Sequence, residues 1–433
     1  MLNSSPAARK RVLYLPLAAS IACSTPAGAG DMRGNLSAQA DYFFSEAAQP
    51  DADWQASGSV SADVEFYQQI ADNVSLIMRP FVRVDTQNDD RTHADMREFI
   101  LTTNGQTERG AAWEFSGGLG QVFWGVTESR NPVDVINQID TLEGADGADK
   151  LGQLMLTFKW FNDYGDFEIY ALPHFRERSF ISAEGRPFAG FTVNRAATSF
   201  ESSEGTRHVD AAVRWSRSFD SWDIGLHYFT GTSRDPAFVP SGPAELAPRY
   251  QQMQQTGIDA LGIYGDLNVK AEIIYRRGDE FENHAQAVFG SEYTLVGALA
   301  PLQDKELLPT DWCAEATQIP LVALLCNDRL DVGLVIEYLW DERDELSSQP
   351  FQNDLLAGLR FAFNDERSSE ALIGIVRDLD NSSTTFSLEA STRLFESFRL
   401  SAELRSFSNT SEDPFLQTLA DEDFLSIELS YFF

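Results

Sequence analysis

Charged side chains recur at alternate positions along much of this 433-residue sequence. Asp63 is followed two residues later by Glu65, and Arg79 lies four residues before Arg83. Spacings of two and four place side chains on the same face of a β-strand. Fixed charges of both signs on one face would form a hydrated wall that attracts and orients polar molecules. No nucleophile–base motif accompanies them, so covalent catalysis is not predicted.

A second concentration of charge lies in the segment 124–150. Asn131 could cap a helix there, with Pro132 at its first position. The acidic residues that follow are Asp140, Glu143, Asp146 and Asp149. If the segment folds towards Arg79 and Arg83, it becomes a constriction loop crossed by a transverse electric field. The alternative is a plain surface loop. Its spacing does not match a calcium-binding EF-hand, so no metal site is assigned.

Segments that alternate apolar and polar side chains would position these charges. In 54–66, for example, Val60 and Phe66 fall on one face, whereas Ser59 and Asp63 fall on the other. This period of two is typical of a strand with one apolar face. Roughly eighteen such strands are predicted. Segments 96–103 and 285–295 alternate weakly and 296–330 could contain another hairpin, so sixteen to twenty strands stay open. Their ranges are 35–44, 54–67, 74–85, 96–103, 111–123, 151–160, 166–176, 206–216, 222–231, 251–264, 268–276, 285–295, 331–340, 351–363, 370–378, 384–394, 398–408 and 423–433.

The connections between these strands alternate between short and long. Residues 162–165 and 217–221 are tight turns, whereas 124–150 and 177–205 are long and polar. Short turns at one end and long loops at the other are typical of a transmembrane barrel. A soluble sandwich would need a second sheet to cover the apolar faces, and the strand pattern supplies none. The predicted fold is therefore an all-β, antiparallel up-and-down transmembrane β-barrel.

The N-terminus has a basic start, a short apolar run and a small-residue end, Ala27-Gly28-Ala29. This pattern predicts a signal peptide over 1–29 and leaves 30–433 for the barrel. A formal net charge of −33 argues against nucleic acid as a partner. Cys313 and Cys326 would be the two cysteines of the exported protein, and they are expected to form a disulfide.

The final segment carries the most specific motif. Apolar residues alternate with mostly polar ones up to the last residue, giving Ile427-x-Leu429-x-Tyr431-x-Phe433. This resembles the C-terminal signature by which Gram-negative outer-membrane proteins are recognised for barrel assembly. The resemblance implies Leu429, Tyr431 and Phe433 as an assembly signal. It also implies the barrel-assembly machinery, outer-membrane lipid and lipopolysaccharide as partners, and integral outer-membrane localisation.

Two internal stretches resemble a group of proteobacterial outer-membrane barrels. They are Trp124-Gly125 with Asn131-Pro132-Val133-Asp134, and Pro350-Phe351-Gln352-Asn353-Asp354 followed by Gly358-Leu359-Arg360-Phe361. Chain length and strand number are also similar to the alginate-export and substrate-specific porin families. This likeness concerns architecture and implies no particular cargo.

Inward positions of the predicted strands carry both signs of charge. Those expected to line the lumen are Arg79, Arg83, Arg176, Arg214, Arg360, Arg393, Arg399, Arg405, Asp63, Glu65, Glu389 and Glu403, and the same alternation turns Glu272 and Glu337 inward. The first and last strands of a barrel are neighbours, so Arg79 and Arg83 would join Arg399 and Arg405 in a basic sector. A barrel of this width can hold an aqueous channel. The sequence therefore predicts passive or substrate-selective passage of small polar or sugar-like solutes, without a cofactor.

Inward apolar residues leave an alternative open. They are Tyr67, Phe81, Tyr170, Leu172, Phe229, Leu261, Ile263 and Ile274. They would suit an export or uptake channel for a hydrophobic compound, lipid or polysaccharide, and they could equally stack sugar rings. A membrane-embedded enzyme is less favoured, because no motif marks Ser216 and His227 as a nucleophile–base pair.

The disulfide is directly testable. If Cys313 and Cys326 are joined, the denatured mature protein should take up no alkylating reagent before reduction and two equivalents afterwards. Closing this short loop should stabilise the protein by about 3 kcal/mol on the chain-entropy model. Mass spectrometry of the alkylated peptides measures the pairing. Labelling of both thiols without reductant would contradict it.

Overall fold

The computed structural model describes residues 30–47, 52–144, 147–188, 190–243, 245–298, 329–343 and 351–433. The predicted signal peptide, Asp146 and both remaining cysteines lie outside these residues. Within them, eighteen strands form a single sheet whose neighbours along the chain are antiparallel. No helix among these residues is long and apolar enough to cross a membrane.

The strands of this sheet agree closely with the predicted segments. They are β1 (Asp31–Phe43), β2 (Ala56–Ala71), β3 (Val74–Asp85), β4 (His93–Gln106), β5 (Ala112–Gly120), β6 (Gln153–Asn162), β7 (Gly165–Leu172), β10 (Asp210–Phe219), β11 (Trp222–Thr232), β14 (Gln252–Tyr264), β15 (Leu267–Arg277), β16 (His284–Leu295), β17 (Asp331–Asp341), β18 (Asn353–Ala362), β19 (Glu370–Asp378), β20 (Thr384–Phe395), β21 (Phe398–Ser408) and β22 (Phe424–Phe432). The predicted fold class is confirmed, with the central value of the expected strand count.

The sheet closes between its first and last strands. β1 pairs with β22, and Ala38 lies opposite Leu429. Gly34 and Phe433 exchange two backbone hydrogen bonds of 3.1 Å. Closure removes the free edges, so every strand of the wall has two neighbours and its backbone polar groups are paired without help from lipid.

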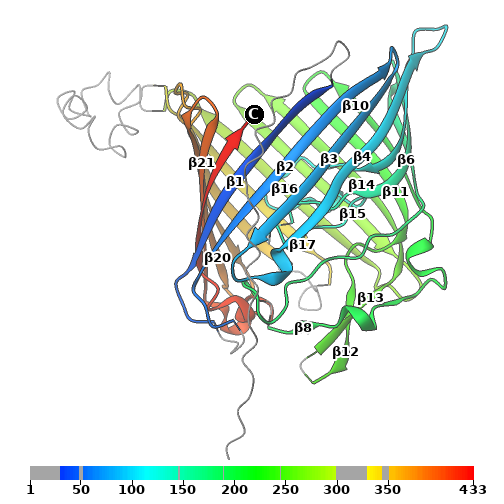
Figure 1. Ribbon diagram of the computed structural model, residues 1–433. Helices are drawn as coiled ribbons and strands as arrows, with labels where there is room; N and C mark the ends of the chain where they lie inside the picture. The colour runs from blue at the N-terminus through cyan, green and yellow to red at the C-terminus, as the bar shows by residue number, and fades with distance from the viewer. Residues whose placement is uncertain are drawn as a thin grey trace, which may run out of the picture.

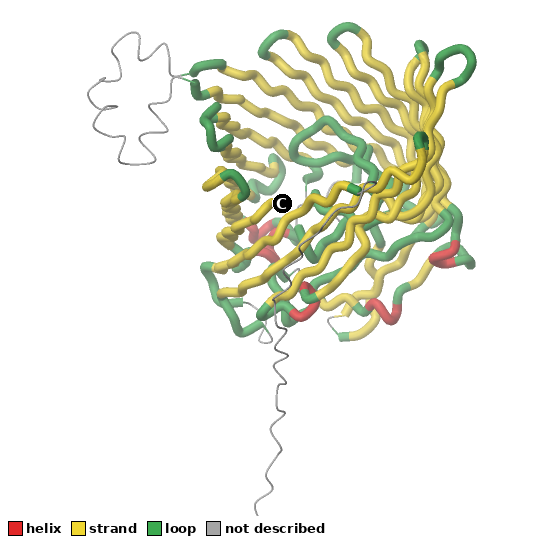
Figure 2. The backbone as a smooth tube through the Cα atoms, turned by 45° about the horizontal axis from the view of Figure 1, so that its top comes forward, coloured by secondary structure: helices red, strands yellow, loops and turns green. Residues whose placement is uncertain are grey.

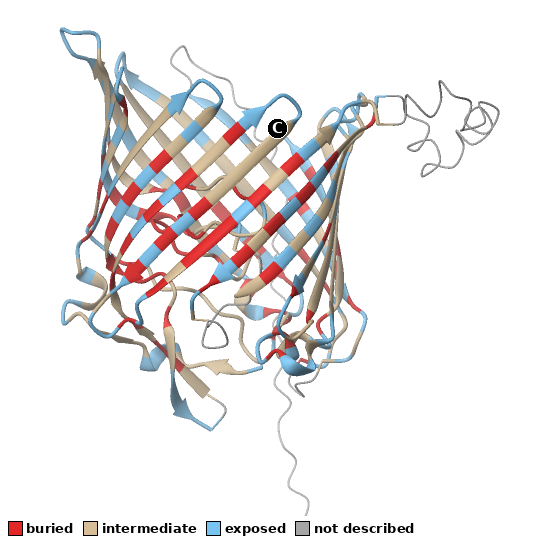
Figure 3. Ribbon diagram, turned by 180° about the vertical axis from the view of Figure 1, so that it is seen from behind, coloured by how far each residue is buried: buried red, intermediate tan, exposed pale blue. Residues whose placement is uncertain are grey.

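Side chains alternate between the two faces of the wall, and burial alternates with them (Figure 3). On β2, Ser59 is 5% exposed and the neighbouring Val60 is 57% exposed. Large apolar side chains thus cover the outside of the barrel, where lipid would take the place of solvent. The polar face lines the lumen, as the alternation predicted.

The two ends of the barrel differ (Figures 1 and 2). At the short-turn end, two-residue turns such as 72–73 and 163–164 join successive strands. At the long-loop end, connections such as 121–152 and 173–209 are far longer. In outer-membrane barrels the short turns are periplasmic and the long loops extracellular.

The long-loop end carries a small sheet that the sequence did not predict. It consists of β8 (Thr192–Val193), β9 (Ser199–Phe200), β12 (Ala237–Gly242) and β13 (Glu245–Tyr250). Short 3₁₀ turns also occur in the loops: η1 (Asp89–Arg91), η2 (Arg195–Ala197), η3 (Gly205–Arg207), η6 (Thr410–Glu412) and η7 (Leu416–Leu419). The chain here folds over the rim of the barrel and does not extend the wall.

The terminal strand generates a prediction about assembly. Tyr431 and Phe433 stack on the outer face, and Tyr431 also contacts Phe398 of β21. Replacing both Tyr431 and Phe433 by Ala should leave most of the protein unassembled in the periplasm, because the outward aromatic pattern is lost. Heat-modifiable electrophoretic mobility in outer-membrane fractions measures the folded amount. Phe432→Ala, on the opposite face of the same strand, is the control, and equal assembly of all variants would refute the signal.

Candidate functional site

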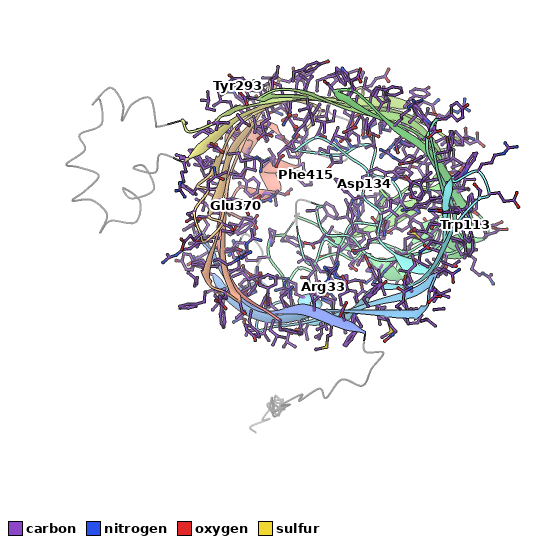
Figure 4. The ribbon with its side chains drawn as sticks, turned by 90° about the horizontal axis from the view of Figure 1, so that it is seen from above. Arg33, Trp113, Asp134, Tyr293, Glu370 and Phe415 are labelled. Carbon is purple, nitrogen blue, oxygen red and sulfur yellow. The ribbon has the colours of Figure 1, made fainter. Side chains whose placement is uncertain are left out.

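The connection between β5 and β6 folds into the barrel. This inward loop (residues 121–152, with 145 and 146 not described) lies inside the ring of strands, where Figure 4 labels Asp134. The helix expected at Asn131 and Pro132 is wrong, since these residues form a turn in which Asp134 N–H donates to Asn131 O at 3.0 Å. No helix follows Asn131 in the described loop, and its side-chain nitrogen Nδ2 donates to Glu272 Oε1 at 2.9 Å.

Two carboxylates on the inner wall accept hydrogen bonds from the loop backbone. Glu272 of β15 accepts from the backbone N–H groups of Val126 and Thr127 at 2.7 and 3.1 Å. Glu337 of β17 accepts from the next two N–H groups, those of Glu128 and Ser129, both at 2.8 Å. Four successive N–H groups are therefore bonded to two buried carboxylates. Hydrogen bonds to an ionised acceptor are the stronger kind, so this segment has a fixed position.

One side of the loop is packed as an apolar core. Trp124, Val133 and Ile136 of the loop are buried against side chains of the wall, among them Tyr170 and Phe229. Leu172 and Ile274 belong to the same core. Four of the apolar residues considered for a hydrophobic route therefore support the loop. Together with the loop residues, this core fills the part of the lumen beside β6, β7, β10, β11, β14 and β15.

The other side of the loop is held by ion pairs. Glu143 pairs with Arg83 at 2.8 Å, and both side chains are buried. Asp140 pairs with Arg97 of β4 at 3.0 Å. Burial raises the pKa of the Asp140 carboxyl, and Arg97 counteracts this rise. The acidic run thus meets the wall. Of its described residues, Glu143 contacts Arg83 and His93 and Asp140 contacts Arg97, whereas Arg79 pairs with Asp63 of the wall.

A water-accessible cavity of about 940 Å³ remains beside the loop. We call it the conduit. It lies between the inward loop and the wall formed by β18–β22 and β1–β4 (Figure 4). Eight carboxylates and six basic side chains line it. They are Asp63, Glu128, Glu143, Asp149, Glu370, Glu389, Glu403, Glu428, Arg79, Arg83, Arg97, Lys150, Arg360 and Arg399.

Each predicted arginine along the conduit has an acidic partner. Arg79 makes a two-pronged contact with Asp63, with both distances 2.8 Å. Arg360 of β18 reaches Glu128 of the loop at 2.7 Å and Glu292 of β16 at 3.1 Å. Arg399 pairs with Glu370. Arg405, which does not line the conduit itself, pairs with Glu403 and Glu389. The expected basic sector therefore does not exist as a field of unpaired charge, because carboxylates alternate with the arginines along the wall.

Other predicted lumen residues lie away from the conduit. Arg176 pairs with Asp95 at 2.7 Å, and it follows the end of β7 instead of lying within a strand. Arg214 pairs with Asp259 beneath the Trp124 ring. Glu65 pairs with the exposed Arg33. Arg393 lies near the short-turn end of β20 and is exposed.

Sequence reasoning missed Arg97, Glu128 and Lys150. Arg97 is the extra residue of an irregularity in β4, where Arg79 pairs with Glu98 and Pro80 pairs with Met96. Such a bulge breaks the alternation on which the inward assignment depended. Glu128 and Lys150 belong to the inward loop, whose irregular backbone has no period from which a face can be assigned.

The buried Arg83–Glu143 pair generates a prediction about the loop. Glu143→Gln leaves Arg83 buried without its counter-ion, which should destabilise the local contact by about 3–5 kcal/mol. Amides of 121–152 should exchange with deuterium faster, while those of the strands stay protected. Hydrogen-exchange mass spectrometry measures both. Glu65→Gln breaks the exposed pair with Arg33, worth about 0–1 kcal/mol, and is the matched control. Unchanged exchange in Glu143→Gln would show that the pair does not hold the loop.

The comparisons with known proteins concern the fold. No protein-family model and no curated protein matches the sequence. Among solved structures, the chain is similar to Wzi of Escherichia coli, an outer membrane protein involved in group 1 capsule assembly and a carbohydrate-binding β-barrel. The TM-score is 0.50 and the identity 10%, over 93% of this chain and 84% of Wzi.

Two further solved structures are similar to this chain over most of its length. OprB of Pseudomonas putida gives a TM-score of 0.45 and 10% identity, over 94% of each chain. The outer membrane channel DcaP of Acinetobacter baumannii gives a TM-score of 0.42 and 9% identity, over 93% of this chain and 97% of DcaP. The closed eighteen-stranded wall, its apolar outer face and the likeness to Wzi agree. The chain has the fold of a porin-like, integral outer-membrane β-barrel.

Proposed function

We propose that the protein is an outer-membrane channel that passes small polar solutes through the conduit. The observation that carries this proposal is the position of the inward loop. It fills one side of the lumen with an apolar core and leaves a hydrated passage lined by charged groups on the other. A passage of this kind favours solutes that exchange their water for polar wall contacts.

The lining charges favour neutral and cationic solutes over anions. Carboxylates outnumber basic groups by eight to six in the conduit, and the arginines that line it are engaged by carboxylates. A passing anion therefore finds cations whose field is already compensated nearby. We expect a modest cation preference in place of the anion attraction that a bare arginine sector would give.

An apolar cargo is poorly matched to this passage. A lipid or hydrocarbon would displace water from Arg79, Arg360 and Glu403 without replacing their hydrogen bonds, which is costly. The apolar inward residues Tyr170 and Phe229 do not compensate, because the core under the loop buries them. The polar-solute function is therefore preferred to the hydrophobic-compound alternative.

Cysteine accessibility tests the route. Ser61 and Ser401 line the conduit, whereas Ala212 is buried in the core on the other side of the loop. In a background with Cys313 and Cys326 replaced by Ser, a charged thiol reagent should lower single-channel conductance of Ser61→Cys and Ser401→Cys. Ala212→Cys is the control and should not respond. Absence of conductance in planar bilayers, or an equal response of all three variants, would refute the proposed route.

A further inference from the structure

Phe123 of the inward loop holds a large apolar surface in the conduit. Its side chain is 64% exposed and lines the cavity. Most other exposed large apolar side chains lie on lipid-facing strand positions, such as Val60 and Phe115, or at turns, such as Tyr164. Phe123 belongs to neither group, because it projects from a loop that lies inside the barrel.

The backbone beneath Phe123 is firmly held. Asn137 is buried, and its side chain accepts from Val122 N–H at 2.8 Å and donates to the carbonyls of Gly120 and Leu151, both at 2.9 Å. Val122 packs against the apolar core and Trp124 is part of it. Phe123 lies between them in the sequence, and its ring is exposed and lines the conduit. Its ring is thus presented to the conduit from a fixed base.

The cavity that Phe123 lines also presents hydrogen-bond donors and acceptors together. Arg79 contacts Asp63 through Nε and one Nη, while its side chain stays 37% exposed. Arg360 and Arg399 are likewise partly exposed beside their acidic partners. An arginine has five N–H groups and a carboxylate about four acceptor positions, so such pairs retain unused capacity. A hydroxyl group, which both donates and accepts, can use either partner.

We propose that the conduit contains a binding site for a neutral cyclic polyol, that is, a sugar ring, with Phe123 as its stacking face. This inference rests on the proposed function and names the solute class for the same passage. One face of a pyranose ring is built of C–H groups and can lie on the phenyl ring, where both lose contact with water. Its hydroxyl edge then faces the paired arginines and carboxylates.

Other solute classes use only part of this site. A small ion would meet the paired charges but leave the Phe123 ring in water. A hydrocarbon would cover the ring but leave Arg79, Arg360 and their partners without water or a replacement hydrogen bond. An open-chain polyol has the hydroxyl groups but no flat C–H face. The combination of an exposed aromatic ring with neutralised ion pairs selects a ring that is apolar on its face and polar on its edge.

Single-channel recording in planar bilayers tests the site. Maltose should produce transient interruptions of the ion current through the wild-type channel, and sorbitol, the open-chain control, should produce far fewer. Phe123→Ala and Phe123→Leu should each shorten the maltose residence time by about threefold to tenfold, the usual worth of an aromatic contact. Phe123→Tyr should retain it. Phe115→Ala, on the lipid-facing side of β5, is the matched control and should behave as wild type.

The outcomes separate this inference from the proposed function. A wild-type channel that conducts ions but shows no maltose interruptions overturns the sugar site and leaves the channel standing. So does a Phe123→Ala or Phe123→Leu channel whose maltose residence time equals that of wild type. A protein that inserts and never conducts refutes the proposed function itself. Conductance of every variant without sugar is measured first, so that a folding defect is recognised before maltose is added.

Discussion

The grip of Glu272 and Glu337 on the inward loop is the interaction on which the interior of this barrel depends. Irregular backbone inside a lumen has N–H groups without a strand partner, and such groups are costly if they are buried unbonded. A buried carboxylate is also costly unless hydrogen-bond donors replace the water that it has lost. The four hydrogen bonds from the N–H groups of 126–129 to Glu272 and Glu337 satisfy the loop donors and the buried acceptors together. The buried position of the two carboxylates and the conformation of the loop therefore depend on each other.

The two sides of the lumen follow from this attachment. Once residues 126–129 are fixed to β15 and β17, Trp124 and Ile136 must lie against the adjoining strands, and their apolar surfaces make that side a packed core. The acidic end of the loop is then carried across to β3 and β4, where Arg83 and Arg97 receive it. The conduit is the space left between these two attachments and the remaining wall. Its walls keep their inward polar side chains accessible, since in the described part of the chain the inward loop packs against the other side of the lumen.

The barrel wall could be predicted from the sequence because its physics is local and periodic. The bounds of β3 and β19 were predicted to the residue. One face of such a strand contacts lipid and the other faces the lumen, so apolar and polar side chains alternate along its whole length. The small sheet was missed because β8 and β9 have only two residues each and no period, and because β12 and β13 each contain a proline, which argues against a strand. The same alternation placed Glu272 on the inner wall, but its partners in the loop lie 139 to 146 residues away in the sequence, and only the three-dimensional structure joins them.

Some contacts of the candidate site could also be predicted from the sequence, and others could not. Arg83 and Glu143 were both singled out, and the structure brings them together. The helix at Asn131 was wrong, because the loop backbone here is held by hydrogen bonds to Glu272 and Glu337 of the wall and forms only a turn. The basic sector failed for a different reason. Face assignment counts charges on one strand at a time, but the field in a lumen is set by cross-strand neighbours. Asp63 beside Arg79 and Glu370 near Arg399 cancel what a single-strand count suggests.

The difference between the charge of the whole chain and the charge of the conduit bears on how such a barrel would select between solutes. The chain carries a formal charge of −33, yet the conduit lining differs by only two between acidic and basic side chains. Charges outside the conduit act weakly beyond a Debye length of about 8 Å at physiological salt. They concentrate counter-ions near the protein without deciding which solute passes. In the channel proposed above, discrimination arises where the wall contacts are fixed, in the conduit that Phe123 and the paired charges line.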